Sequence, residues 1–285
     1  MKKTNKLLVW FLGAYYRSGI RGSWWLTSLL AEHISGLQNI RLSTENGLIY
    51  LDLRIEAARG ILADPISRSG EDAVMKSFVR PGDVVFDVGA HLGFYTLVLS
   101  KLSDQHGKVY AFEPNPELLP TLKQTIAHLP NVKLFELALS AETGESELFV
   151  PEDASMASIS NWTDGIAGNV HSVSCETRAL EEMIEAGEVP LPTFIKCDVE
   201  GAELSVFAGA RKILDRVDAP IVLFELNRKA MRAFGDSPED CRQFLVSMKS
   251  ANYSFFEVRA DEIKKVQSWD IAYTNILAVP ASRLS

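Results

Sequence analysis

Asp87, Gly89, His91 and Gly93 lie close together in the stretch VVFDVGAHLGFYT, residues 84–96. The stretch begins as a continuous apolar run and continues with helical spacing, which predicts a buried strand, a tight turn and a helix. Glycine gives such a turn its backbone freedom, and the free N–H groups at the start of the helix attract polar ligand groups. The pattern therefore predicts that this turn binds a nucleotide-like ligand.

The missing second glycine of this turn separates two ligand classes. A dinucleotide site has the spacing G-x-G-x-x-G, which lets the backbone approach a diphosphate. His91 stands at the position of the second glycine and would crowd a diphosphate. S-adenosylmethionine has no phosphate, and its ammonium and ribose hydroxyls favour carboxylates such as Asp87 and Glu113. We therefore expect S-adenosylmethionine here, with an NAD-dependent oxidoreductase or a non-catalytic binding module as alternatives. Asp87 as a helix cap and His91 as a filler of the turn also stay open.

A second group of ionisable residues lies in FIKCDVEGAE, residues 194–203. Lys196 and Asp198 interrupt an otherwise apolar strand and share one of its faces. Because buried charges persist only when they are paired or used, the two form either a structural ion pair or part of an active site. Glu200 and Glu203 follow where the dipole of the next helix favours acids. We expect Asp198 to be catalytic, either as a base or as the electrostatic partner of a sulfonium.

Glu200 and Glu225 are the alternative bases, and Glu225 lies in a further apolar strand, PIVLFEL. The acids Asp198, Glu200 and Glu225 are also potential ligands of a divalent cation such as Mg²⁺. Since no ligand spacing connects them along the sequence, we expect no metal. The three cysteines have neither a CxxC nor a zinc spacing and are expected to be free thiols.

The elements that position these residues alternate along the chain. Apolar strands and helical segments follow one another from Asp83, which predicts an α/β protein with a largely parallel sheet. The expected strands are 84–88, 108–114, 132–140, 193–199, 220–226, 253–258 and 275–280, and the expected helices are 71–79, 94–102, 116–129, 180–187, 200–214 and 239–251. Residues 145–150 and 170–180 interrupt the alternation as added antiparallel strands. The polar segment 151–169 between them is expected to be a long loop and a lid over a substrate.

The first part of the chain differs in composition from the rest. Residues 1–31 carry five basic residues, many aromatic residues and no acid. Their apolar run, 7–16, is too short to cross a bilayer. Three interpretations stay open: a helix packed on the main domain, a helix on an anionic membrane surface, or a cleaved export signal. We expect residues 1–66 to form an extension, with a hairpin over 39–54, and residues 67–285 to form the main domain.

The overall charge argues against one class of partner. The 285 residues include 29 Lys and Arg against 37 Asp and Glu, which gives a net charge of -8. An acidic chain is a poor partner for nucleic acid, so we expect none. We expect a cytoplasmic location, with peripheral membrane contact through residues 1–31 as an option, and the sequence leaves the oligomeric state open.

Five motifs together resemble the FkbM family of S-adenosylmethionine-dependent methyltransferases: FDVGAHLGFYT, YAFEPNP, ELALSAETGE, FIKCDVEGAE and VLFEL. The resemblance extends over roughly residues 70–226 in order and spacing. It implies a class I methyltransferase fold, a Rossmann-like three-layer sandwich around a seven-stranded, mostly parallel sheet of order 3-2-1-4-5-7-6. It also implies transfer of a methyl group to a hydroxyl of a sugar, a glycan or a secondary metabolite.

The resemblance assigns roles to individual residues of the motifs. It implies that the turn from Asp87 to Gly93 holds the methionine part of the cofactor and that Glu113 holds the ribose. It places Asp198 opposite the transferred methyl group. The residues expected to contact S-adenosylmethionine are Asp87, Gly89, Ala90, His91, Gly93, Glu113, Pro114, Asn115, Leu137, Ala138 and Asp198, of which Leu137 and Ala138 would lie near the adenine.

Overall fold

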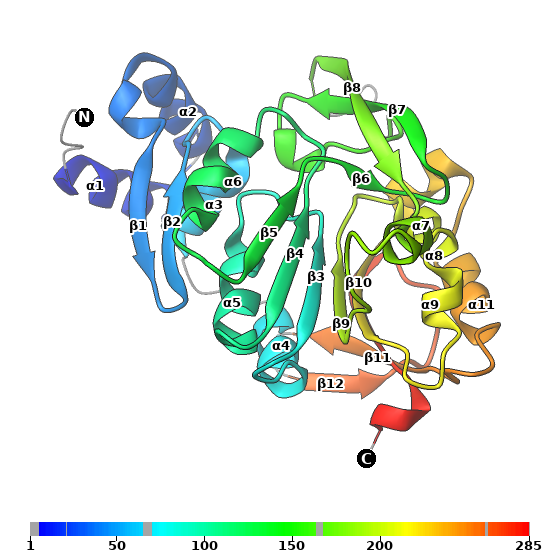
Figure 1. The fold of residues 1–285 in the computed structure, drawn as a ribbon. Helices are drawn as coiled ribbons and strands as arrows, with labels where there is room; N and C mark the ends of the chain where they lie inside the picture. Colours follow the sequence, from blue (N-terminus) through cyan, green and yellow to red (C-terminus); the bar gives the residue numbers. More distant parts are fainter. Residues whose placement is uncertain (1–5, 21, 65–69, 164–167, 260–261, 285) are drawn as a thin grey trace.

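A central sheet of eight strands organises the chain, as the computed structural model shows (Figure 1). The structure describes residues 6–20, 22–64, 70–163, 168–259 and 262–284. The strands of this sheet are β3 (Val84–Val88), β4 (Lys108–Phe112), β5 (Val132–Phe135), β9 (Phe194–Cys197), β10 (Ile221–Asn227), β11 (Ser254–Arg259), β12 (Glu262–Lys265) and β13 (Tyr273–Val279). Their order across the sheet is β12-β11-β13-β10-β9-β3-β4-β5.

Five neighbouring strands, from β5 to β10, are parallel, and the other three run antiparallel to their neighbours. Counted along the chain without β12, the strands are arranged 3-2-1-4-5-7-6, which is the order that the resemblance implies. The predicted number of seven is wrong, and the complete order differs, because β12 adds an eighth strand beside β11. Every residue of β12 is exposed, so it lacks the apolar alternation by which a strand is recognised.

Helices cover both faces of the sheet, because successive side chains of a strand point to opposite faces. Val85 of β3 packs in one cluster with Met75 and Leu99, whereas its neighbour Phe86 packs in another with Met183 and Phe207. The helices of the first face are α4 (Glu71–Phe78), α5 (Phe94–Ser103) and α6 (Leu119–Ile126). Those of the second are α7 (Leu180–Glu185), α8 (Glu203–Ala208), α9 (Arg211–Leu214), α10 (Arg228–Met231) and α11 (Pro238–Val246). Two 3-10 turns complete the main fold: η3 (Arg232–Phe234) follows α10, and η4 (Ala281–Arg283) follows β13. This arrangement confirms the three-layer sandwich.

The expected helix over 200–214 is two helices, α8 and α9. The backbone at Gly209 passes so close to the loop after β6 that a Cβ there would lie 2.0 Å from the carbonyl oxygen of Ser140. The Gly209 carbonyl in turn accepts a hydrogen bond of 2.9 Å from the N–H of Glu181. The helical spacing of the sequence continues through this point, but the contact with Ser140 breaks the helix.

A three-stranded sheet lies beyond one end of the main strands, at the top of Figure 1. It contains β6 (Ala138–Leu139), β7 (Gly144–Pro151) and β8 (Val170–Arg178), and β7 and β8 pair antiparallel as expected. The expected strand over 132–140 is divided between β5 and β6. The loop between β7 and β8 contains a short 3-10 turn, η2 (Ala154–Met156), and its residues 164–167 lie outside the described part of the chain.

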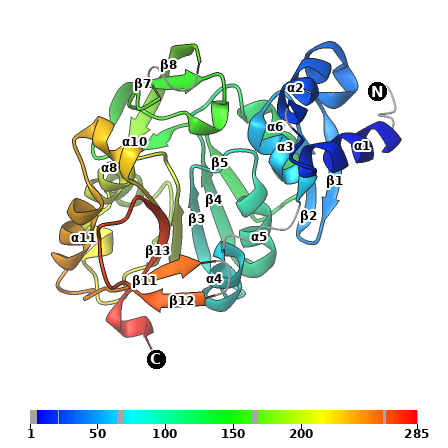
Figure 2. The ribbon, with the colours of Figure 1, turned by 180° about the vertical axis from the view of Figure 1, so that it is seen from behind.

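The N-terminal segment packs against the open edge of the sheet, beside α6 (Figure 2). Its elements are α1 (Lys6–Arg17), α2 (Ser23–His33), η1 (Ser35–Leu37), β1 (Ile40–Thr44), β2 (Gly47–Leu51) and α3 (Glu56–Ala63). The antiparallel pairing of β1 and β2 confirms the hairpin predicted from the Asn-Gly pair. Its buried Ile49 and Leu51 share one core cluster with Leu92 and Leu118 of the main fold. The predicted boundary near residue 66 lies outside the described residues.

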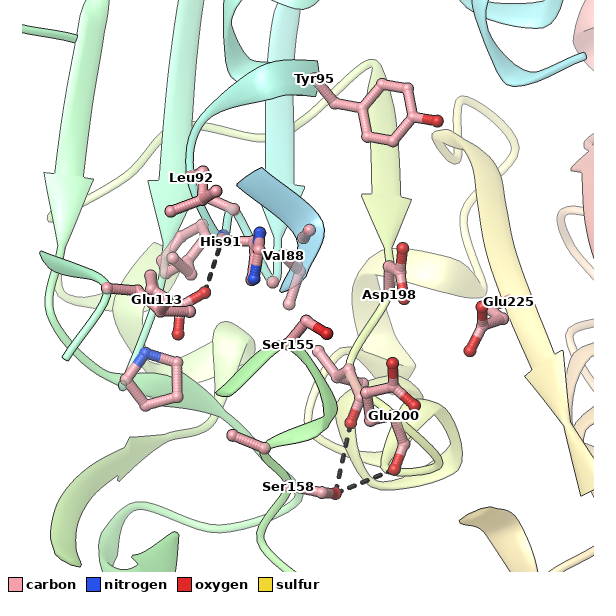
Figure 3. Close-up of a pocket in the computed structure, with 18 of the residues that line it drawn as sticks. Val88, His91, Leu92, Tyr95, Glu113, Ser155, Ser158, Asp198, Glu200 and Glu225 are labelled. Atoms are coloured by element: carbon pink, nitrogen blue, oxygen red, sulfur yellow. Dashed lines mark hydrogen bonds between the residues drawn. The ribbon is translucent and has the colours of Figure 1, made fainter. Parts of the chain in front are cut away.

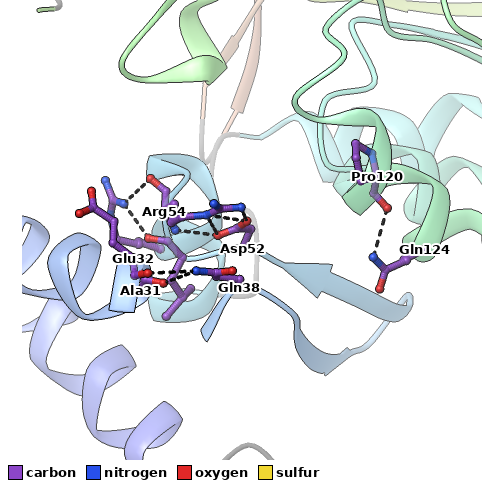
Figure 4. A network of polar contacts seen from close by, with 9 residues as sticks. Ala31, Glu32, Gln38, Asp52, Arg54, Pro120 and Gln124 are labelled. Carbon is purple, nitrogen blue, oxygen red and sulfur yellow. Dashed lines mark hydrogen bonds and ion pairs between the residues drawn. The ribbon is translucent and has the colours of Figure 1, made fainter. Parts of the chain in front are cut away.

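Polar contacts fix the end of this hairpin to the preceding helix (Figure 4). The side chain of Gln38 donates a hydrogen bond of 2.8 Å to the carbonyl of Ala31, at the carboxyl-terminal part of α2. After β2, the guanidinium of Arg54 binds the carboxylate of Asp52 with two nitrogens. The Gln38 contact holds the start of the hairpin to α2, and the Asp52–Arg54 contact holds the chain where it turns from β2 into α3.

Among the described residues no helix is long and apolar enough to cross a membrane. Helix α1 packs on α3, and its Leu12 is buried, as the interpretation of a packed helix requires. Trp10 and Trp25 nevertheless keep 67% and 57% of their surface exposed. The first five residues, with Lys2 and Lys3, lie outside the described part.

Candidate active site

The turn between β3 and α5 has the tight geometry that its glycines predict. Gly89 has φ +85°, and a Cβ at this position would lie 1.9 Å from the carbonyl oxygen of Asp198. Gly93 has φ +86° and packs against Leu122 of α6. Only glycine permits this left-handed backbone together with such a close approach. The turn and the loop after β9 therefore touch through their backbones.

His91 in the middle of the turn is held by its backbone. Its N–H donates a hydrogen bond of 2.7 Å to Oε2 of Glu113, which follows β4 (Figure 3). The buried Nε2 of its ring has no hydrogen-bond partner among the described residues. Burial lowers the pKa of His91 to about 4, so the imidazole is neutral at neutral pH. The turn thus presents an uncharged ring with an unused nitrogen.

Glu113 connects two loops at the carboxyl ends of β3 and β4. Besides the His91 N–H, it accepts a hydrogen bond of 2.9 Å from the N–H of Asn115 through Oε1. Burial raises the pKa of Glu113 to about 7, although the two N–H donors act in the opposite direction. The carboxylate is therefore fixed in position at the mouth of the predicted ribose site.

Asp87, Gly93 and Asn115 lie behind the surface that a ligand would contact. The carboxylate of Asp87 accepts a hydrogen bond of 2.5 Å from Thr96, while its second oxygen is buried without a partner among the described residues. Burial raises the pKa of Asp87 against the opposing effect of Lys196. Asn115 donates to the carbonyl of Ala154. These residues support the loops, and the remaining predicted cofactor residues line the cavity: Gly89, Ala90, His91, Glu113, Pro114, Leu137, Ala138 and Asp198.

Lys196 and Asp198 form the ion pair that their spacing allows. The Lys196 ammonium is 2.9 Å from Oδ2 of Asp198 and 3.9 Å from Oε1 of Glu71 on α4. It also lies 4.5 Å from the centre of the Tyr95 ring. Burial acts to lower the pKa of Lys196, but the surrounding carboxylates outweigh it and raise the pKa well above its usual value. Lys196 is therefore charged and Asp198 is its nearest counter-ion.

Glu203 has the structural role that its place at a helix start suggests. Its Oε1 accepts hydrogen bonds from the N–H groups of Val199 and Gly201, at 3.1 and 3.4 Å. The side chain is fully buried, and burial raises its pKa to about 7. Glu203 thereby fixes the loop that carries Asp198 and Glu200.

Glu200 and Glu225 lie beside Asp198, although the sequence gives no spacing that connects the three. One oxygen from each of the three carboxylates lies within 4.8 Å of the others. Burial, followed by the charge of Asp198, raises the pKa of Glu200 to about 8 and that of Glu225 to about 10. Both are therefore protonated at neutral pH when no cation is bound.

A cavity of about 490 Å³ connects the glycine turn with these acids. Two further segments complete its wall: helix α3, with Gly60 and Ile61, and residues 154–159 of the loop after β7. The hydroxyl of Ser158 donates a hydrogen bond of 2.9 Å to the carbonyl of Glu200, which joins this loop to the acidic side of the cavity (Figure 3). Part of the segment predicted to be a lid therefore forms one wall.

Sequence reasoning missed the contributions of α3 and of Tyr273. Residues 56–63 contain no motif, and only their packing on α1 and β2 brings them over the cavity. Tyr273 lies on β13, opposite Asn227 at the end of β10, and it reaches the cavity through an antiparallel pairing. No local pattern in the sequence could have identified either, because both depend on contacts between distant segments.

The side chains of the cavity fit a cationic ligand without phosphate. Its ionisable residues include five acids, Asp64, Glu113, Asp198, Glu200 and Glu225, whereas Lys196 is the single Lys or Arg among the described lining residues. Because Lys196 is already paired with acids, nothing in this wall would neutralise a diphosphate. These observations favour S-adenosylmethionine over NAD.

Comparison with known proteins agrees with this interpretation. The Methyltransferase FkbM domain model matches residues 87–255, which is more than half of the chain. The hexuronic acid methyltransferase AglP of Haloferax volcanii is 31% identical over 157 residues, which cover 54% of this chain and 62% of AglP. The 2-O-methyltransferase NoeI of Sinorhizobium fredii is 24% identical over 193 residues, covering 62% of this chain and 77% of NoeI.

A third similar protein is the 31-O-demethyl-FK506 methyltransferase FkbM of Streptomyces tacrolimicus, 36% identical over 81 residues. These residues cover 28% of this chain and 31% of that protein. The chain thus spans less than two thirds of the length of two of these three relatives. The names of these relatives give a hexuronic acid, a 2-O position and 31-O-demethyl-FK506 as what is methylated.

Proposed function

The chain belongs to the FkbM family of S-adenosylmethionine-dependent methyltransferases, and we propose that it transfers the methyl group to a hydroxyl of a sugar, a glycan or another small molecule. The observation that carries this proposal is the single cavity shared by the glycine turn, by the acids after β9 and by Glu225 of β10. The turn and Glu113 serve the cofactor, and Asp198, Glu200 and Glu225 serve the acceptor. Membership of this family argues against the NAD-dependent alternative.

S-adenosylmethionine supplies an electrophilic methyl group bound to a positively charged sulfur. The backbone of Gly89 and Ala90 and the carboxylate of Glu113 would bind the methionine and ribose parts, with Leu137 and Ala138 beside the adenine. The neutral His91 adds no positive charge next to the sulfonium. Alignment of acceptor and donor, and exclusion of water by α3 and the loop 154–159, would supply much of the acceleration.

The acceptor hydroxyl must lose its proton during transfer. Asp198 is paired with Lys196, so its carboxylate can accept a hydrogen bond from the acceptor or stabilise the sulfonium. Glu225, with its raised pKa, holds a proton in the absence of a ligand and can donate a hydrogen bond to the acceptor oxygen. A bound cation would lower this pKa and allow Glu200 or Glu225 to act as the base.

Incubation with methyl-labelled S-adenosylmethionine and a panel of hydroxylated acceptors tests the proposal. The panel should contain neutral sugars, uronic acids, glycans and macrolide alcohols. We expect label in at least one acceptor, and Asp198→Asn should reduce turnover by about 10²-fold while adenosylhomocysteine still binds. Binding of adenosylhomocysteine without transfer to any acceptor would contradict the proposal and favour a non-catalytic binding module. Full turnover in Asp198→Asn would refute the catalytic role of Asp198.

We also infer that the N-terminal helices contact a membrane surface. Trp10, Phe11, Ile20 and Trp25 are exposed on or beside α1 and α2, in a part of the sequence that is rich in basic residues. Such a surface suits the interface of an anionic membrane and would bring the cavity near a lipid-linked glycan. Co-sedimentation with anionic vesicles, reduced in a Trp10→Ala/Trp25→Ala variant and absent with neutral vesicles, supports this contact. The cytoplasmic location and the absence of a nucleic-acid partner stay predictions from the sequence.

A further inference from the structure

Three carboxylates from two adjacent parallel strands meet at one point of the cavity. Asp198 and Glu200 belong to the loop after β9, and Glu225 belongs to β10, whose neighbouring Phe224 pairs with Cys197 of β9. One oxygen of each carboxylate lies within 4.8 Å of the other two. Figure 3 shows the three side chains around the same space.

Glu225 gives separate evidence that this space receives a ligand. Its residue is 6% exposed, and its Oε2 is buried without a hydrogen-bond partner among the described residues. The side chain points toward Asp198 and Glu200 rather than into the protein (Figure 3). A buried carboxylate oxygen without a partner is costly, so its orientation indicates a group that is bound there.

Lys196 does not supply that group. Its ammonium contacts Asp198 and Glu71, and no ion pair of Lys196 with Glu200 or Glu225 is present among the described residues. The Lys196 ammonium donates its hydrogen bond to Oδ2 of Asp198, so Oδ1 can bind another partner. Within the described part of the chain, Lys196 therefore gives neither glutamate a cationic partner.

We propose that Asp198, Glu200 and Glu225 bind one divalent cation of the Mg²⁺ or Mn²⁺ class. The ligand atoms are all carboxylate oxygens, which hard cations prefer, and neither His nor Cys belongs to the group. Metal–oxygen distances are about 2.0–2.5 Å, so two ligand oxygens on opposite sides of one ion are about 4–5 Å apart. This value agrees with the separation of the carboxylate oxygens here. The convergence of the strand ends supplies the ligand spacing that is absent from the sequence.

The use of this cation rests on the proposed function, although its binding does not. A cation at this point would hold the acceptor hydroxyl beside the transferred methyl group and favour loss of the hydroxyl proton. It would also offset the charge of the acids on this side of the cavity when a negatively charged sugar enters. Acceptors with two neighbouring oxygens that can chelate the ion should therefore be preferred.

Binding is tested with MnCl₂ alone, by the electron paramagnetic resonance signal of free Mn²⁺. We expect the wild-type protein to remove the signal of one equivalent and Mg²⁺ to restore it by competition. Glu225→Gln should weaken binding by at least about tenfold, and Glu142→Gln, a change of an exposed acid outside the cavity, should bind as the wild type does. Glu200→Gln, in the loop, provides a second ligand variant should Glu225→Gln fail to fold by circular dichroism.

The proposal would be overturned if the wild-type protein left the free Mn²⁺ signal unchanged at millimolar Mn²⁺. It would also be overturned if a folded ligand variant bound Mn²⁺ as well as the wild type does. The transfer assay then separates binding from use. Loss of transfer after EDTA, restored by Mg²⁺, supports the role in holding the acceptor, and transfer that is indifferent to EDTA refutes that role while the methyltransferase function stands. Binding of Mn²⁺ without transfer to any acceptor would refute the proposed function and leave the cation site intact.

Discussion

Replacement of Gly60 should separate binding in the cavity from stability of the fold. Gly60 lies in the interior of α3 and lines the cavity, and a Cβ at this position would meet no atom within 4 Å. A side chain at residue 60 would therefore extend into open space within the site. The same change would remove a glycine from a helix, where it costs about 1 kcal/mol relative to alanine.

The two effects have opposite signs and can be measured on the same samples. Gly60→Ala should raise Tm by about 2 °C in a chain of this size and leave the affinity for adenosylhomocysteine nearly unchanged. Gly60→Leu should retain most of this stability. It should lower the affinity for adenosylhomocysteine by at least about tenfold, or about 1.4 kcal/mol, because the branched side chain occupies the cavity. Calorimetric titration measures the affinity, and differential scanning calorimetry measures Tm.

The reasoning would be refuted by a folded Gly60→Leu protein that binds adenosylhomocysteine as the wild type does. In that case α3 would border an empty part of the cavity, outside the cofactor site. A Tm well below that of the wild type would contradict the open space at Gly60. Gly60→Ala serves as the control for the helix itself, since it changes helix propensity with little loss of volume.

Three further changes test the supporting carboxylates and the turn. Glu113→Ala should weaken the binding of adenosylhomocysteine by about 1–3 kcal/mol in calorimetric titration, because it leaves the N–H groups of His91 and Asn115 without their acceptor. Gly89→Ala should destabilise the turn by at least about 1–2 kcal/mol in urea unfolding and lower the affinity with it, and a neutral result would contradict the close approach to Asp198. Burial raises the pKa of Glu203 from 4.5 to about 7, so the folded protein binds more protons than the unfolded chain, and stability should fall as pH rises through this range. Glu203→Gln keeps the oxygen that accepts the two N–H groups and should reduce the slope of this pH dependence in urea unfolding, to which Glu113 also contributes. An unchanged slope would assign the pH dependence to groups other than Glu203.

Local signals in the sequence explain why the central strands and the motif turn could be predicted. The strand, turn and helix over 84–103 are neighbours in sequence, and the glycines of the turn have the left-handed backbone that their residue type suggests. The pair of Lys196 and Asp198 follows from the alternation of side chains along one strand. Each of these features depends on residues a few positions apart.

Features that depend on distant contacts escaped prediction. The break between α8 and α9 results from the approach of Gly209 to Ser140, and the eighth strand β12 has no buried residue to mark it. Helix α3 reaches the cavity because the hairpin before it packs on the edge of the sheet. The convergence of Glu200 and Glu225 likewise requires the register of β9 against β10, which the sequence does not display.

Helix α3 and Tyr273 lie outside the segment 87–255 that matches the family, yet both line the cavity. The donor side and the acids therefore come from the segment shared by the family, while part of the opposite wall comes from flanking sequence. Relatives could keep the same methyl-donor chemistry and change the molecules they admit by altering only these flanks. Exchange of residues 56–64 between two family members is then a direct route to a transferase with a new acceptor preference.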